Sequence, residues 1–86
     1  MEIVISPSAK NDLEFWKKSG NTGVQNKITE LLNSIRENPF TGIGKPEPLK
    51  HNYSGLWSRR INREHRLVYE VTEDSIMILS LKGHYE

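Results

Sequence analysis

Three side chains in this sequence could together cleave a phosphodiester bond without a metal ion. Attack by an internal 2′-hydroxyl needs a base to take the 2′ proton, an acid to protonate the departing 5′-oxygen, and fixed positive charge at the phosphoryl oxygens. Glu47, His84 and Arg66 are the candidates for base, acid and fixed charge. Tyr85, which follows His84, could donate a hydrogen bond to the phosphate or stack on a base.

The local sequence around these candidates supports the chemistry but also allows ordinary interpretations. Glu47 lies between two prolines, which restrict the backbone and lower the entropic cost of holding its carboxylate in place. Arg66 falls in a predicted strand, and a guanidinium held by a strand suits bidentate contact with a phosphate. The alternatives are a solvated loop glutamate, a surface arginine paired with an acidic neighbour, and a frayed chain end for His84 and Tyr85.

Positive charge is concentrated in one part of a nearly neutral chain. The net charge is +1, but residues 45–66 carry six basic against two acidic side chains, a net of +4. A basic segment of this kind indicates a polyanion-binding site, with an ordinary solvated face as the alternative. The predicted RNA-binding side chains are Lys45, Lys50, His51, Arg59, Arg60 and Arg63.

Length and composition exclude several classes of protein. The 86 residues predict a single domain, 1–86, with a thin core that a second copy of the chain would help to stabilise. There is no cysteine, so disulfides and thiolate metal sites are excluded, and the spacing of the three histidines matches no familiar metal pattern. No run of about 20 apolar residues and no signal-peptide pattern is present. We expect a cytoplasmic protein with no cofactor, metal ion or membrane partner.

The first half of the chain predicts a strand followed by two helices. Residues 2–5 are rich in β-branched side chains and predict a strand. Ser6-Pro7 is a typical helix start, and apolar residues recur at helical spacing to about Lys18. A second helix, capped by Asn21 or Thr22, carries an apolar stripe from Val24 to Ile35 and ends at Asn38-Pro39.

The second half predicts an irregular loop and then a meander of strands. Two glycines and two prolines make residues 41–48 a loop, which carries Glu47. Strands are expected at 56–61, 65–71 and 75–81, with a further short strand at 49–51. The order predicts an α+β domain in which the N-terminal helical hairpin packs on a twisted, mainly antiparallel sheet of four to five strands.

The alternation of side chains within 65–71 separates the catalytic candidate from the core. Leu67, Tyr69 and Val71 would face one way and Arg66 the other, so Arg66 lies on the uncovered face if the first set meets the helices. His65 could serve as a second acid, but its position alongside Leu67 favours a buried, hydrogen-bonded histidine. Trp57 could stack on a base, although core packing is the more common role.

Several segments resemble the YoeB toxin family. Residues 39–52, 54–61 and 64–69 resemble its central block, and Gly83-His84-Tyr85 resembles its C-terminal His-Tyr. The resemblance implies a RelE-type fold, a homodimer, and cleavage of mRNA in the decoding site of the ribosome. It also implies neutralisation by a YefM- or Axe-like antitoxin, with operator DNA bound only by the toxin–antitoxin complex.

The same resemblance implies a role for each candidate residue. It makes Glu47 the general base, His84 the general acid, Arg66 the group that stabilises the transition state, and Tyr85 a residue that positions the scissile phosphate. Lys50 and Arg60 match basic residues that line the RNA path. One departure is Glu86, an extra carboxylate after the tyrosine at which the family pattern ends.

Two other functions compete with the nuclease. A ParE-like toxin would block DNA gyrase on a similar fold without an acid–base site. A purely structural or DNA-binding partner is a weaker alternative, because the chain has no recognition-helix signature.

Overall fold

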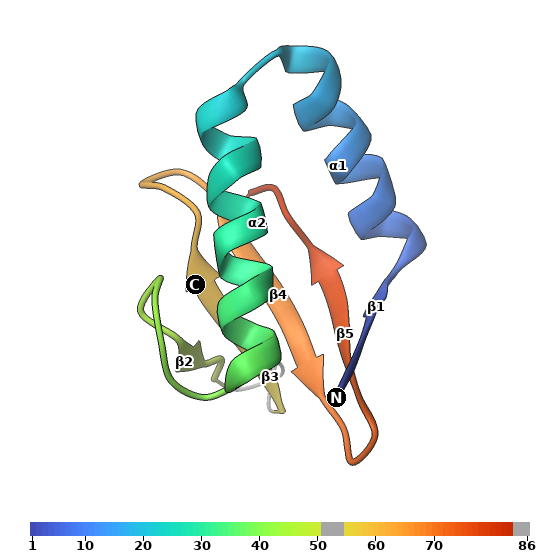
Figure 1. The fold of residues 1–86 in the computed structure, drawn as a ribbon, viewed down its shortest axis with the longest axis vertical. Helices are drawn as coiled ribbons and strands as arrows, with labels where there is room; N and C mark the ends of the chain where they lie inside the picture. The colour runs from blue at the N-terminus through green and yellow to red at the C-terminus, as the bar shows by residue number, and fades with distance from the viewer. Residues whose placement is uncertain (51–54, 84–86) are drawn as a thin grey trace.

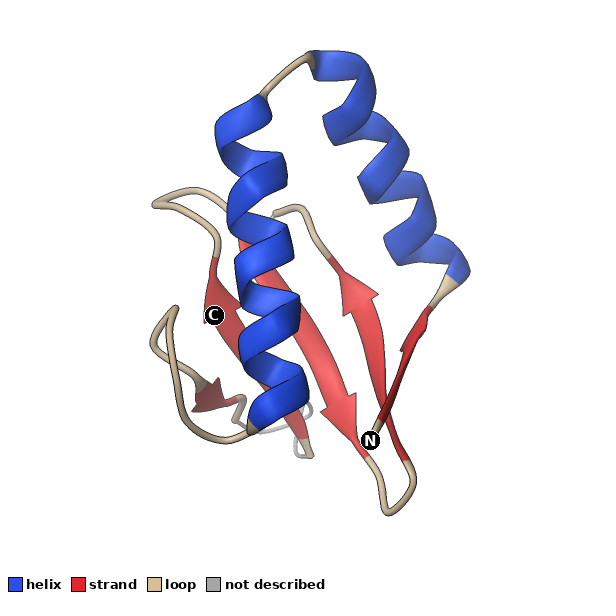
Figure 2. Ribbon diagram, in the orientation of Figure 1, coloured by secondary structure: helices blue, strands red, loops and turns tan. Residues whose placement is uncertain are grey.

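Two helices pack against one face of a five-stranded sheet in the computed structural model, which describes residues 1–50 and 55–83 (Figures 1 and 2). The elements in chain order are β1 (Glu2–Ile5), α1 (Pro7–Ser19), α2 (Thr22–Glu37), β2 (Glu47–Pro48), β3 (Leu56–Arg60), β4 (Arg66–Val71) and β5 (Ser75–Ser80). The predicted α+β architecture is therefore confirmed. No helix within the described ranges is both long and apolar enough to cross a membrane.

The strand order in the sheet is β1-β5-β4-β3-β2. The three pairings that link β2 to β5 are antiparallel, as the predicted meander requires. β1 pairs with β5 in parallel, which makes the sheet mixed. A parallel pair needs a long connection between its strands, and here the helical hairpin and the strands β2 to β4 separate β1 from β5 in the sequence.

The predicted helix ends are confirmed by their capping contacts. The Ser6 hydroxyl accepts a hydrogen bond from the backbone N–H of Ala9 at 3.1 Å, with Pro7 in the first turn. The Asn21 side chain accepts from the N–H of Val24 at 3.0 Å and starts α2. These side chains satisfy backbone donors that have no partner inside the helix.

The strand predicted at 49–51 is wrong over its described part, because the edge strand lies two residues earlier. β2 comprises Glu47 and Pro48, which pair with Ser58 and Trp57 of β3. Leu49 adds a backbone hydrogen bond, from its N–H to the carbonyl of Leu56 at 2.9 Å. A proline is tolerated here because an edge strand can lack one N–H without breaking an interior ladder.

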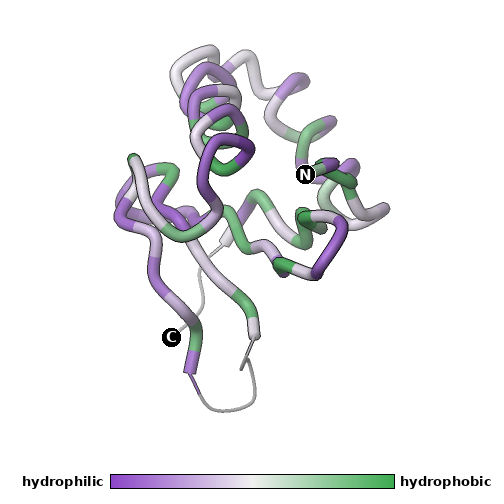
Figure 3. The backbone as a smooth tube through the Cα atoms, turned by 60° about the horizontal axis from the view of Figure 1, so that its bottom comes forward, coloured by the Kyte–Doolittle hydropathy of each residue, from purple (hydrophilic) through white to green (hydrophobic). Residues whose placement is uncertain are grey.

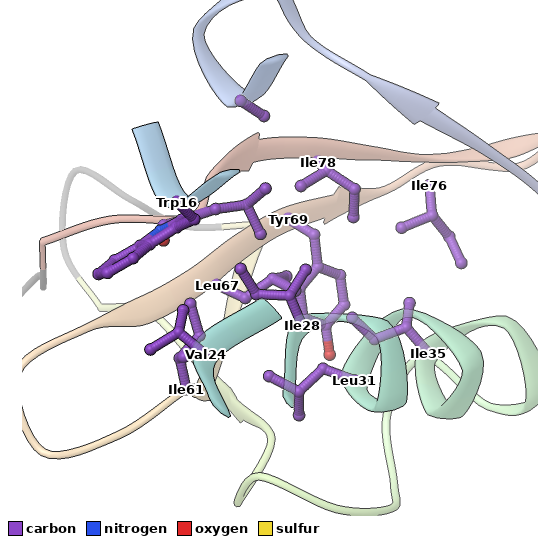
Figure 4. Close-up of a cluster of buried hydrophobic side chains, with 12 residues drawn as sticks. Trp16, Val24, Ile28, Leu31, Ile35, Ile61, Leu67, Tyr69, Ile76 and Ile78 are labelled. Atoms are coloured by element: carbon purple, nitrogen blue, oxygen red, sulfur yellow. The ribbon is translucent and has the colours of Figure 1, made fainter. Parts of the chain in front are cut away.

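The core lies between the helices and the sheet (Figure 4). Hydrophilic and hydrophobic residues are interspersed along both helices (Figure 3), so each helix turns only one stripe toward the sheet. Tyr69 is the largest fully buried side chain of the core cluster. The buried side chains are Ala9, Trp16, Val24, Ile28, Leu31 and Ile35 from the helices, and Ile61, Leu67, Tyr69, Ile76, Ile78 and Leu81 from the sheet and its ends.

A register shift in the β4–β5 pairing sets the direction of the C-terminal segment. Val68 pairs with Ser80, whereas Tyr69 pairs with Ile78, so Leu79 is an extra residue in β5. A bulge of this kind reverses the alternation of the side chains that follow it. Leu81 consequently enters the core, where it is fully buried.

The loop between α2 and β2 passes so close to the core that Gly44 has little room for a side chain. Gly44 has a φ of 81°, and a Cβ there would lie 2.6 Å from the Leu31 side chain. Its carbonyl accepts a hydrogen bond from the N–H of Arg60 at 2.7 Å, which ties the loop to the end of β3. The torsion disfavours a side chain, and the close approach adds a steric cost.

We expect Gly44→Ala to lower the free energy of unfolding by about 2–4 kcal/mol, which combines a strained torsion with overpacking. Gly20→Ala is the matched control, because Gly20 also has a positive φ of 71° but open space around it. The control should cost only about 1 kcal/mol. Urea unfolding followed by tryptophan fluorescence measures both, and equal losses would contradict the steric argument.

Candidate functional site

Glu47, Arg60 and Arg66 lie on the same face of the sheet, opposite to the helices. Directly paired residues of antiparallel strands project to one face, and Glu47 pairs with Ser58 while Arg60 pairs with Arg66. Leu67 and Tyr69 are buried in the core cluster with the helices, whereas Val68 between them is buried but does not belong to that cluster, which confirms the predicted alternation in β4. We call this helix-free side of the sheet the open face.

The register also gives the spacing between the carboxylate and the guanidinium. Two strand separations and a two-residue offset lie between Glu47 and Arg66, which places their Cα atoms about 12 Å apart. Side chains of this length, with a phosphate group between them, can span that distance. The Glu47 side chain is exposed and Arg66 is half-buried.

A basic cavity of about 510 Å³ adjoins this face at the β3–β4 turn. Among the described residues, its lining contains five cationic side chains and no acidic one. It brings together four of the predicted site residues, although Glu47 is not among its lining. The lining residues are Lys27, Gly44, Lys45, Arg60, Ile61, Asn62, Arg63 and Arg66.

Lys27 is the cationic residue of this cavity that the sequence analysis missed. It lies on α2, far in sequence from the basic segment 45–66, and its side chain is half-buried. It stands three residues after Val24 and four before Leu31, so helical spacing puts it beside the apolar stripe. This spacing could have shown that Lys27 borders the buried face of α2. It could not have shown that this part of α2 lies next to the β3–β4 turn.

Arg66 is held in place by the turn that precedes it. Its guanidinium donates from Nη1 to the carbonyl of Asn62 at 3.2 Å. The Asn62 side chain in turn accepts from the backbone N–H groups of Glu64 and His65, each at 2.9 Å. An asparagine that closes a turn in this way orders the loop without further packing.

The described chain ends at Gly83, and this residue is bonded to the start of β4. The N–H of Arg66 donates to the carbonyl of Gly83 at 2.7 Å, and the N–H of Gly83 donates to Nδ1 of His65 at 2.9 Å. His84 and Tyr85 follow directly but lie outside the described residues, as does His51. Lys50 is described and is exposed.

Arg59 corrects the predicted RNA-binding set, because its side chain is fully buried. Its Nε donates to the hydroxyl of Tyr69 at 3.1 Å, and Nη1 donates to Oγ of Ser34 at 2.8 Å. The remaining bonds go to backbone carbonyls of the loop after α2: Nη1 to Ile43 at 3.1 Å, and Nη2 to Asn38 at 2.7 Å and Thr41 at 2.9 Å. The prediction that Arg59 binds phosphate is therefore wrong. Alternation in β3 sends Arg59 toward the helices and Arg60 to the open face.

Tyr69 completes this buried network. Burial raises the pKa of the Tyr69 phenol, while the hydrogen bond and charge of Arg59 lower it. The protonated phenol donates to the carbonyl of Pro39 at 2.6 Å and accepts from Arg59. The loop that leads to Lys45 and Glu47 is thus hydrogen-bonded to β3 and β4 on the buried side of the sheet.

The other aromatic and histidine candidates have packing contacts. Trp57 is half-buried against the core, and its ring centroid lies 5.1 Å from that of Phe40. His65 packs edge-on against Trp16, with centroids 4.9 Å apart. Within residues 1–50 and 55–83, no group of three histidine, aspartate or glutamate side chains is arranged to hold a metal ion.

Comparison with known proteins gives one family across the chain. The family model for the YoeB-like toxin of bacterial type II toxin–antitoxin systems matches residues 5–85. Toxin YoeB of Escherichia coli K12 is 49% identical over 85 residues, which cover 99% of this chain and 100% of that protein. Toxin YoeB of Synechocystis is 48% identical over 86 residues, which cover 100% of this chain and 99% of that protein.

Solved structures agree with the sequence comparison. A YoeB/ParE toxin from Agrobacterium tumefaciens superposes with a TM-score of 0.92 at 39% identity, covering 99% of this chain and 100% of that one. The YoeB dimer from Staphylococcus aureus gives 0.88 at 48% identity, and the YoeB–YefM complex from the same organism gives 0.86 at 49%; each covers 99% of this chain and 98% of that one.

We expect Arg59→Met to lower the free energy of unfolding by about 3 kcal/mol or more, because it leaves buried acceptors without their donor. Arg60→Met is the matched control, since Arg60 is the exposed neighbour of the same residue type. Its effect should stay within about 0.5 kcal/mol. Urea unfolding at one pH measures both, and a small loss for Arg59→Met would show that the buried network contributes little.

Proposed function

The chain belongs to the YoeB-like toxins of bacterial type II toxin–antitoxin systems, and we propose that it is a ribosome-dependent endoribonuclease that cuts mRNA without a metal ion. The observation that carries this proposal is the placement of a carboxylate and a guanidinium on one face of the sheet, beside a cavity lined by cations. A toxin that only blocks a partner needs surface complementarity, but it does not need a base and a fixed charge on one open face.

In the proposed reaction, Glu47 accepts the proton of the 2′-hydroxyl of the cleaved nucleotide. The 2′-oxygen attacks phosphorus, and the bond from phosphorus to the 5′-oxygen breaks. His84 gives the departing oxygen a proton, so the products are a 2′,3′-cyclic phosphate and a free 5′-hydroxyl. Arg66 offsets the negative charge that builds on the phosphoryl oxygens, and Tyr85 positions the phosphate.

The basic cavity supplies the electrostatic path for the RNA. Lys27, Lys45, Arg60 and Arg63 line it together with Arg66. Cations arranged in this way bind successive phosphates without reading the bases. Lys50, which is exposed after β2, and His51 extend the proposed path. Arg59 is left out because all of its contacts are internal.

The proposed partners follow from family membership and from the relatives. The YoeB of Staphylococcus aureus is known as a dimer and in complex with YefM. We infer that this chain likewise forms a homodimer and is neutralised by a YefM- or Axe-like antitoxin, and that operator DNA is bound only by that complex. Its substrates, mRNA on the ribosome, place it in the cytoplasm.

We expect Glu47→Gln to reduce cleavage of translated mRNA by about 10²- to 10⁴-fold, because an amide cannot take the 2′ proton. Primer extension on message from a purified translation system measures the breaks. Glu73→Gln is the control, since Glu73 is an exposed carboxylate in the β4–β5 turn; it should cut like the unmodified protein. Intact message together with chromosome damage in expressing cells would instead support gyrase poisoning.

We expect His84→Ala to abolish cleavage while the affinity for ribosomes changes little, because the variant lacks the acid but keeps the basic cavity. Glu86→Gln is the neighbouring control and should cut at least as well, since it removes a negative charge that stands two residues after the proposed acid in the sequence. Ribosome co-sedimentation and cleavage are measured on the same samples. Equal cleavage by His84→Ala would remove His84 from the mechanism.

A further inference from the structure

His65 has a backbone contact that its packing role does not explain. Its ring is half-buried against Trp16, at an interplanar angle of 82°. The Nδ1 atom faces the other way and accepts the N–H of Gly83, an exposed residue, at 2.9 Å. Because Nδ1 accepts, the neutral ring carries its proton on Nε2. An aromatic side chain without this acceptor would fill the same space but leave the Gly83 N–H to water.

The contact to His65 is the last of several that fasten residues 81–83. Leu81 donates its N–H to the Asp12 carboxylate at 2.9 Å, and its carbonyl accepts from Nε1 of Trp16 at 2.9 Å. The Gly83 carbonyl accepts the N–H of Arg66 at 2.7 Å. α1 and β4 therefore hold both ends of this short segment by directed hydrogen bonds.

Gly83 occupies a particular position relative to the proposed chemistry. It is bonded through its carbonyl to Arg66, the proposed phosphate ligand, and it directly precedes His84, the proposed acid. Consecutive Cα atoms are about 3.8 Å apart, so the anchor at Gly83 limits where the next residue can start. Small errors in the placement of a reacting group reduce rates steeply, by about 10²-fold for 1 Å.

We propose that His65 is a positioning residue, whose Nδ1 acceptor fixes Gly83 beside Arg66 and thereby delivers the terminal His84-Tyr85 pair to the bound phosphate. This inference rests on the nuclease function proposed above. Trp16 sets the plane of the imidazole, Asn62 holds its backbone through the N–H at 2.9 Å, and the acceptor then points at one N–H only. His65 itself does not touch the RNA in this scheme.

The test uses two amides that differ in where they offer an oxygen. In His65→Asn the amide oxygen can take the place of Nδ1, whereas in His65→Gln it lies nearer the place of Nε2. His65→Phe keeps the aromatic edge against Trp16 and offers no acceptor. We expect kcat for cleavage of ribosome-bound mRNA to fall by about 10- to 100-fold in the Phe and Gln variants, with KM for the ribosome unchanged. The Asn variant should recover most of kcat.

A second readout does not depend on activity. The amide proton of Gly83 in a ¹⁵N-labelled sample should exchange faster and shift upfield in the Phe and Gln variants, and stay near the unmodified protein in the Asn variant. Urea unfolding of each variant identifies any that does not fold, and the comparison of Asn with Gln then carries the test.

The possible outcomes distinguish failure of the positioning role of His65 from failure of the proposed nuclease function. If the unmodified protein cuts no message on ribosomes, the proposed function fails and the positioning role fails with it. If the unmodified protein cuts and the Phe and Gln variants cut equally well, the function stands and the role of His65 is overturned. An Asn variant as slow as the Gln variant would also overturn it, because the acceptor at Nδ1 would then not be what matters.

Discussion

A buried guanidinium is the constraint on which the rest of this small domain depends. Arg59 is fully buried and makes five hydrogen bonds, one for each N–H that a guanidinium carries. An unpaired buried charge costs several kcal/mol, so the side chain is tolerated only because its donors are satisfied. Its acceptors are neutral: a phenol, a hydroxyl and three carbonyls. Two of them belong to Ser34 and Asn38 at the C-terminal end of α2, where the helix dipole favours a cation.

This network determines where the proposed general base lies. The three carbonyls that Arg59 binds belong to residues 38–43, and the next contact along the loop is the bond from the N–H of Arg60 to Gly44. The chain is thus returned to the edge of β3 at a fixed point, and Glu47 reaches the open face three residues later. An apolar contact would hold the loop less specifically, because hydrophobic burial has no direction. A chain with only 35% hydrophobic residues gains positional accuracy from directed polar bonds instead.

The sequence was sufficient to predict both helices, four of the five strands and the face of β4 that carries Arg66. Caps at Ser6 and Asn21, the apolar stripe of α2 and the alternation around Arg66 are local signals, and the structure contains each of them. The same alternation in β3 would have placed Arg59 beside Trp57 and Ile61, inside the molecule, but its charge suggested a surface role. Three features depend on contacts between distant segments and have no local signal: the two-residue strand at Glu47, the extra residue Leu79 in β5, and the meeting of Lys27 with the basic segment.

The two segments that carry the proposed base and acid are both attached to the β3–β4 hairpin. The register of this hairpin therefore decides whether the proposed site can form. The loop with Glu47 is tied to β3, and the segment that ends at Gly83 is tied to β4. A slip of one residue between β3 and β4 would send Arg60 or Arg66 into the core and bring its neighbour to the open face. Apolar packing opposes such a slip, because the slip would take the buried side chains of Leu67 and Tyr69 out of the core. The hydrogen bond from Arg59 to Tyr69 also joins the two strands on the buried side, in the register that places Arg60 opposite Arg66 on the open face. Arg59, which is buried and lies outside the proposed RNA path, therefore helps to keep its neighbour Arg60 on the open face.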